Sequence, residues 1–235
     1  MERVTRLIAA LDTADQCQAA AWAEAVAPHV DAIKLGLEFT CAQGVAEACR
    51  TAAGSPLFLD LKLHDIPNTV AAAVRALLPH APAMLTVHAQ GGAAMIQAAR
   101  HAMSGDDRHK AARPLLLAVT VLTSLDAAAL HDTGIAGGTR QQVLRLGRLA
   151  MQAGADGLVC SPHEIAVLRD ALGDAPVLVV PGVRPLGAQP DDQRRVMTPA
   201  AAAHAGADWI VVGRPITRAM DPAAAAAAIK AELHL

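Results

Sequence analysis

The chain has 235 residues, of which 53% are hydrophobic, and this is enough apolar material for a large core, which excludes a disordered protein. Its formal net charge at pH 7 is −2, its Lys and Arg residues are scattered, and only 2% of its residues are aromatic. These features argue against nucleic-acid binding and favour a small-molecule ligand.

Short apolar runs that are rich in β-branched residues recur along the chain and predict strands. Between them lie Ala-rich stretches with helical spacing, such as 14–27, 70–78, 141–152 and 223–233. The eight predicted strands are 7–11, 32–37, 57–63, 84–87, 115–122, 157–160, 177–180 and 209–212.

The strict alternation of strands and helices predicts a parallel sheet with right-handed crossovers. Eight units favour a closed (β/α)8 TIM barrel, and no change in composition divides residues 1–235, so we expect a single α/β domain. A doubly wound open sheet is the alternative, but no G-x-G-x-x-G motif follows the first strand. In a barrel, the active site lies at the carboxyl ends of the strands.

The third predicted strand carries two charged residues, Asp60 and Lys62, within an apolar run. Residues two apart in a strand point to the same face, so these side chains share one. A purely structural ion pair is one interpretation, but the hydration cost of burying charges favours a functional role. Lys34 interrupts the second strand in the same way, so neighbouring strands can bring all three side chains to one mouth of the barrel.

The run Asp60-x-Lys62-x-x-Asp65-Ile-Pro-x-Thr69 resembles the signature that follows the third barrel strand of orotidine 5'-phosphate decarboxylases. The resemblance implies a carboxy-lyase that converts orotidine 5'-phosphate to UMP and carbon dioxide, the last step of de novo pyrimidine biosynthesis, without a cofactor or a metal ion. Other strand ends resemble the same family in the same order, at 9–12 (AALD), 34–36 (KLG), 86–88 (TVH), 121–124 (VLTS), 181–184 (PGVR) and 211–216 (VVGRPI).

The resemblance also implies roles for individual residues. Lys62 would stabilise a carbanion at C6 and then protonate it, in an alternating charge array with Lys34, Asp60 and Asp65. Asp60 would lie near the substrate carboxylate. The other residues expected to bind the substrate are Asp12 and Lys34 at the ribose, Thr123 or the adjacent Ser124 at the base, and Arg184, Gln193, Gly213 and Arg214 at the phosphate.

Family members place the equivalents of Asp65 and Thr69 in the neighbouring subunit's site, which implies a twofold homodimer. For Arg184, a solvated loop cation is the alternative interpretation. We assign no catalytic role to His88 at the end of the fourth strand, because a barrel histidine is more often structural.

The cysteines and the N-terminal segment indicate a cytoplasmic protein. The four cysteines form no C-x-x-C pair, and each lies in an apolar or Ala-rich segment, as small buried residues do. The apolar stretch before Asp12 is too short for a secretory signal, and no apolar run approaches about 18 residues. We therefore expect no contact with a membrane.

Two other functions are consistent with parts of the pattern. Related sugar-phosphate barrel enzymes, such as 3-keto-gulonate 6-phosphate decarboxylase, share the D-x-K-x-x-D pattern and use magnesium. They carry an acidic ligand where this chain has Lys34, and a cation there would oppose metal binding. A catalytically inactive nucleotide-binding barrel is the second alternative, but both Asp60 and Lys62 are present.

Overall fold

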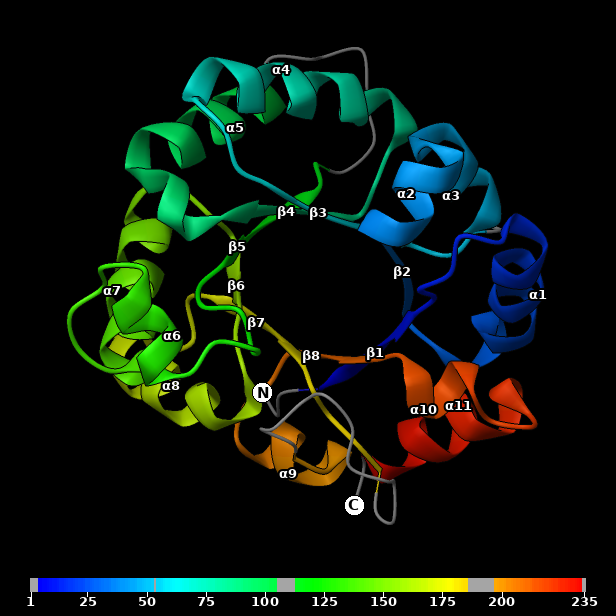
Figure 1. Cartoon of the computed structure of the whole chain (residues 1–235). Helices are drawn as coiled ribbons and strands as arrows, with labels where there is room; N and C mark the ends of the chain where they lie inside the picture. The colour runs from blue at the N-terminus through cyan, green and yellow to red at the C-terminus, as the bar shows by residue number, and fades with distance from the viewer. Residues whose placement is uncertain (1–3, 53, 105–112, 186–196, 234–235) are drawn as a thin grey trace.

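The computed structural model describes residues 4–52, 54–104, 113–185 and 197–233. Within these ranges, eight parallel strands close into a barrel in chain order, and β8 pairs with β1 (Figure 1). The predicted (β/α)8 TIM barrel is thereby confirmed. The strands are β1 (Arg6–Ala10), β2 (Ala32–Gly36), β3 (Leu57–Leu63), β4 (Met84–His88), β5 (Leu115–Val119), β6 (Gly157–Val159), β7 (Val177–Pro181) and β8 (Trp209–Val212).

Helices surround the barrel and cover the outer face of its strands (Figure 1). No helix in the described ranges is both long and apolar enough to cross a membrane. The α-helices are α1 (Gln16–Val26), α2 (Leu37–Gln43), α3 (Val45–Thr51), α4 (Pro67–Leu77), α5 (Gly92–Ser104), α6 (Ala127–Asp132), α7 (Thr139–Gln152), α8 (Ile165–Leu172), α9 (Pro199–His204), α10 (Arg214–Thr217) and α11 (Pro222–Glu232). Short 3-10 helices are η1 (Ala27–His29), η2 (Leu78–His80), η3 (Ala89–Gly91) and η4 (Pro162–Glu164).

Local sequence explains where several helices begin. The carboxylate of Asp15 accepts the N–H of Gln18 and caps α1, as expected of an aspartate at this position. Helix α4 begins at Pro67, three residues before the predicted start, because proline suits the first turn of a helix, where its missing N–H has no partner to lose.

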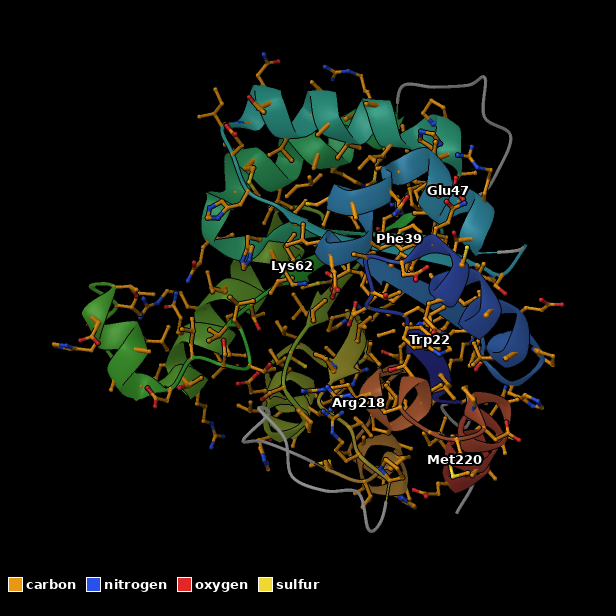
Figure 2. The ribbon with its side chains drawn as sticks, turned by 45° about the vertical axis from the view of Figure 1, so that its right-hand side comes forward. Trp22, Phe39, Glu47, Lys62, Arg218 and Met220 are labelled. Carbon is orange, nitrogen blue, oxygen red and sulfur yellow. The ribbon has the colours of Figure 1, made fainter. Side chains whose placement is uncertain are left out.

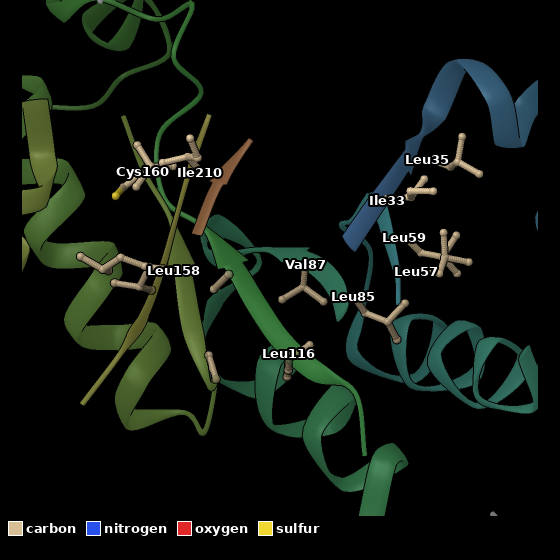
Figure 3. Packing of buried hydrophobic residues seen from close by; sticks show 14 of the residues in the cluster. Ile33, Leu35, Leu57, Leu59, Leu85, Val87, Leu116, Leu158, Cys160 and Ile210 are labelled. Carbon is tan, nitrogen blue, oxygen red and sulfur yellow. The ribbon is translucent and has the colours of Figure 1, made fainter. Parts of the chain in front are cut away.

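Buried side chains form two layers on opposite faces of the strands, because alternate residues of a strand point to opposite faces. The outer layer lies between the strands and the helices and includes Ile33, Leu59 and Leu116 (Figure 3). The inner layer fills the barrel and consists of Ile8, Ala10, Ala32, Phe58, Met84, Leu117, Val179, Trp209 and Val211. Lys34 and Asp60 follow inner-layer residues by two positions and therefore point into the barrel.

Three aspartates repeat one arrangement at the amino-terminal ends of the strands. Each directly precedes a strand, accepts the N–H of the second residue of the previous strand, and forms an ion pair with a lysine or arginine. Asp156, for example, accepts the N–H of Leu116 at 2.8 Å and contacts Arg113 at 2.7 Å. The other two sets are Asp31 with Leu7 and Lys230, and Asp208 with Leu178 and Arg169. We assign this end of the barrel to stability, and its opposite end to chemistry.

Candidate active site

A cavity of about 680 Å³ lies at the carboxyl ends of the strands, within the size range of small-molecule sites. Apolar side chains of the barrel interior, such as Val119, Val159 and Val179, line part of it. Charged and aromatic side chains from several elements line the rest. Trp22 of α1, Lys62 of β3 and Arg218 after α10 are three of these (Figure 2).

Most of the predicted site residues line this one cavity. Asp65 and Thr69 do not line it: Asp65 lies in the segment that joins β3 to α4, Thr69 lies in the first turn of α4, and both are exposed. Gln193 lies outside the described residues. In the loop after β5, Thr123 lines the cavity, whereas Ser124 is exposed and does not. The predicted residues that line the cavity are Asp12, Lys34, Asp60, Lys62, Thr123, Arg184, Gly213 and Arg214.

Four of these side chains form a continuous row of alternating charges. The Nζ atom of Lys34 lies 2.9 Å from Oδ1 of Asp12 and 3.6 Å from Oδ2 of Asp60. The same Oδ2 atom lies 2.7 Å from Nζ of Lys62. The Asp65 carboxylate lies outside this row and accepts the N–H of Ile66. Within one chain, the row therefore consists of Asp12, Lys34, Asp60 and Lys62.

The two central members of the row, Lys34 and Asp60, are held in their charged forms. Burial favours the neutral form of Asp60, but Lys34, Lys62 and the hydrogen bonds from Lys62 and Thr86 outweigh it and lower the pKa below the ordinary 3.8. Burial likewise favours neutral Lys34, yet Asp12 and Asp60 raise its pKa above the ordinary 10.5. Lys34 and Asp60 thus keep their charges at neutral pH although both are largely buried.

Gly36 leaves the space that the Lys34–Asp12 ion pair occupies. A Cβ atom at this position would lie 3.1 Å from Nζ of Lys34 and 3.4 Å from Oδ1 of Asp12. Any larger residue would force the ion pair to shift. The lack of a side chain thus explains why glycine suits position 36 in the Lys-Leu-Gly motif.

Some lining residues had no clear signal in the sequence. Trp22 and Glu38 lie on α1 and α2 and not at strand ends, so the barrel pattern alone does not indicate them. Arg218 follows Arg214 by four residues, and both line the cavity. Their spacing was a usable signal, because residues four apart share one face when a helix begins at 214, as α10 does. Among the described residues, no group of three or more His, Cys, Asp or Glu side chains is arranged to hold a metal ion.

A closed (β/α)8 barrel with charged lysines and carboxylates in its mouth defines an enzyme that acts on a small polar molecule. The chain belongs to the orotidine 5'-phosphate decarboxylase / HUMPS family, whose model matches residues 5–229. This confirms the resemblance that the strand-end motifs indicate.

Individual relatives match along their whole lengths. The chain is 61% identical over 233 residues to orotidine 5'-phosphate decarboxylase of Gluconobacter oxydans (strain 621H), and the match covers 99% of each chain. It is 56% identical over 235 residues to the enzyme of that name from Anaeromyxobacter sp. (strain K), covering 99% of this chain and 100% of the relative. The crystal structure of orotidine 5'-phosphate decarboxylase from Lactobacillus acidophilus has a TM-score of 0.88 and 37% identity, covering 98% of this chain and 100% of that chain.

Proposed function

We propose that this chain decarboxylates orotidine 5'-phosphate to UMP and carbon dioxide and so performs the last step of de novo UMP biosynthesis. Family membership over residues 5–229 and relatives of that name along the whole chain support this activity. The observation that carries the mechanism is the partly buried contact between Lys62 and Asp60, where the ammonium group lies 2.7 Å from the carboxylate.

The reaction needs a group that stabilises negative charge at C6 of the pyrimidine ring. When the bond from C6 to the carboxylate carbon breaks, carbon dioxide leaves and the electron pair stays on C6, where no adjacent carbonyl delocalises it. The ammonium group of Lys62 stabilises this charge and then transfers one proton to C6. Because Asp60 holds the ammonium group before the substrate arrives, little reorganisation is needed during the reaction.

The rest of the cavity provides groups for the remainder of the substrate. Asp12 and Lys34 hydrogen-bond the ribose hydroxyls, and Thr123 hydrogen-bonds the pyrimidine. The phosphate binds to Arg184, Arg214 and the main-chain N–H of Gly213, because guanidinium groups and main-chain amides suit phosphate oxygens. All of these residues line the same cavity, which supports the assignment.

We also propose a homodimer in which each chain contributes Asp65 and Thr69 to its partner's site. Both residues are exposed, and Ile66 beside them is 67% exposed although it is large and apolar, as expected of a contact surface. Mixing inactive Lys62→Ala and Asp65→Ala chains tests this. Heterodimers should regain one intact site and with it activity, whereas no recovery in confirmed heterodimers would contradict the shared site.

The proposed reaction uses no cofactor or metal ion and takes place in the cytoplasm. The buried, charged Lys34 in the cavity would repel a divalent cation, which supports chemistry without a metal. All four cysteines are free, which fits a reducing compartment.

The experiment that tests the activity follows the ultraviolet absorbance of orotidine 5'-phosphate after addition of purified protein, with a chelator present throughout. Conversion to UMP is the expected result. No conversion by folded protein would contradict the proposal. In that case, activity on a sugar phosphate that requires added magnesium would indicate a metal-dependent relative. Tight UMP binding without turnover would indicate an inactive barrel.

A further inference from the structure

Strands β3 and β4 pair irregularly beside the charge row. Leu59 pairs with Leu85, and the next pair along is Leu63 with Val87. Three residues of β3, at 60–62, therefore lie opposite the single residue Thr86 of β4. The extra residues form a bulge, and bulges re-aim the side chains that they carry.

The main chain of Lys62 is unusual within this bulge. Its φ angle is +51°, a region that residues other than glycine, asparagine and aspartate seldom occupy. Its N–H donates to the hydroxyl of Thr86 at 2.8 Å, so a side chain satisfies this group in place of a main-chain carbonyl. Such a conformation persists only where surrounding contacts hold it.

The same hydroxyl also fixes the carboxylate of Asp60. Thr86 donates its one hydroxyl proton to Oδ1 of Asp60 at 3.0 Å, while Oδ2 of Asp60 contacts the two lysines. Both carboxylate oxygens thus have partners, and the plane of the group is set from two sides. Thr86 is fully buried and is not one of the residues that line the cavity, so it acts on these groups from behind.

We propose that Thr86 is a positioning residue for decarboxylation, whose hydroxyl holds the Lys62 main chain and the Asp60 carboxylate in the geometry that aims the Lys62 ammonium group at the substrate. This inference rests on the proposed function. Since the hydroxyl accepts from one residue and donates to the other, one group sets the relative position of both.

The test compares Thr86→Val, which keeps the shape but removes the hydroxyl, with Thr86→Ser, which keeps the hydroxyl. Thr86→Val should lower kcat about 10- to 100-fold, a loss typical of misplaced catalytic groups, and change KM for orotidine 5'-phosphate less than about threefold. Thr86→Ser should keep kcat within about threefold of the wild type. Thr86→Ala is a second hydroxyl-free variant, used if the valine variant does not fold.

Thr120→Val is the matched control. Thr120 is 1% exposed, and its hydroxyl donates to the carbonyl of Val159 at 3.1 Å, outside the charge row. The Thr120→Val variant should lose about as much stability as Thr86→Val but keep the kcat of the wild type. If Thr86→Val retains the kcat of this control while the wild type is active, or if serine and valine at position 86 lose kcat equally, the positioning role is overturned.

A second readout needs no substrate. The carbon signal of the Asp60 carboxyl, assigned by its loss in Asp60→Asn, should titrate at higher pH in Thr86→Val than in the wild type, because a hydrogen bond that favours the carboxylate is gone. Thr86→Ser and Thr120→Val should leave the titration of this signal unchanged. An unchanged titration in Thr86→Val would overturn the inference. An inactive wild type would contradict the proposed function, and the titration would then show by itself only whether the Thr86 hydroxyl fixes the Asp60 carboxylate.

Discussion

Lys34 and Asp60 come from neighbouring strands, and Nζ of Lys34 lies 3.6 Å from Oδ2 of Asp60 inside the mouth of the barrel. Strands β2 and β3 pair in register, with Gly36 opposite Asp60, so the sheet itself sets this spacing. The same oxygen of Asp60 contacts Lys62 at 2.7 Å. One carboxylate therefore bridges two ammonium groups on a rigid support, as a preorganised site requires.

The pH dependence of stability should reveal this bridge. In the folded chain, the pKa of Asp60 lies below its ordinary 3.8, so between these two values the unfolded chain binds the extra proton. Asp60 thus contributes stability above its unfolded pKa, and the contribution is lost as the pH falls through the folded pKa. The loss of unfolding free energy between about pH 6 and pH 3 should be smaller in Asp60→Asn than in the wild type.

Urea unfolding at a series of pH values measures this difference. Asp170→Asn is the control, because Asp170 is exposed on α8 and lies outside the charge row. It should keep the pH dependence of the wild type. Equal acid sensitivity in Asp60→Asn and the wild type would count against the bridging role of Asp60.

Replacing Lys62 by alanine should abolish turnover while leaving nucleotide binding largely intact. The ammonium group is the proposed proton donor and the charge that stabilises the carbanion, and these contributions arise mainly in the transition state. We expect kcat to fall by at least about 1,000-fold and Kd for UMP to change less than about tenfold. Single-turnover kinetics and calorimetry measure the two quantities. A variant with near-normal turnover would rule out the assigned role.

Replacing Arg214 by alanine should weaken binding through the phosphate group alone. A hydrogen bond to a charged group contributes about 1.5–3 kcal/mol, so affinity for UMP should fall about 10- to 100-fold. Affinity for uridine, which lacks the phosphate, should stay nearly constant. Arg145→Ala on the exposed face of α7 is the control and should change neither affinity. Equal losses for uridine and UMP would contradict the assignment.

The existence of the strands was predictable because each is a short apolar run in the local sequence, but their exact ends were not. The end of β5 was predicted at residue 122, but the strand ends at Val119. Residues 120–122 are still β-prone, yet β6 has only three residues, and its last pair joins Val119 to Val159. The length of a partner strand, which local sequence does not reveal, thus decides where β5 ends.

The charge row was partly predictable from local sequence. The two-residue period of a strand predicts that Asp60 and Lys62 share one face, and their side chains do meet. The bulge and the positive φ angle of Lys62 were not predictable, because they depend on Thr86, which is 24 residues away from Lys62 in the chain. Contacts of this kind appear only when the strands pair.

The aspartates at the opposite end of the barrel should affect stability without affecting catalysis. In Asp156→Ala, the N–H of Leu116 and the guanidinium groups of Arg100 and Arg113 lose their carboxylate partner. Leaving a partly buried N–H without a partner and removing the two ion pairs should cost about 2 kcal/mol. For a chain of this length, the expected fall in Tm is about 4–8 °C. Thermal unfolding followed by circular dichroism measures it.

Asp156→Asn separates the two contributions, because its side-chain carbonyl can still accept the N–H of Leu116 while the charge is gone. It should lose less stability than Asp156→Ala, and the difference reports the hydrogen bond to the strand. Both variants should keep the kcat of the wild type at temperatures where they are folded, since the cavity lies at the other end of the strands. A fall in kcat of folded Asp156→Ala would show that the two ends of the barrel are coupled, contrary to the division of roles proposed for them.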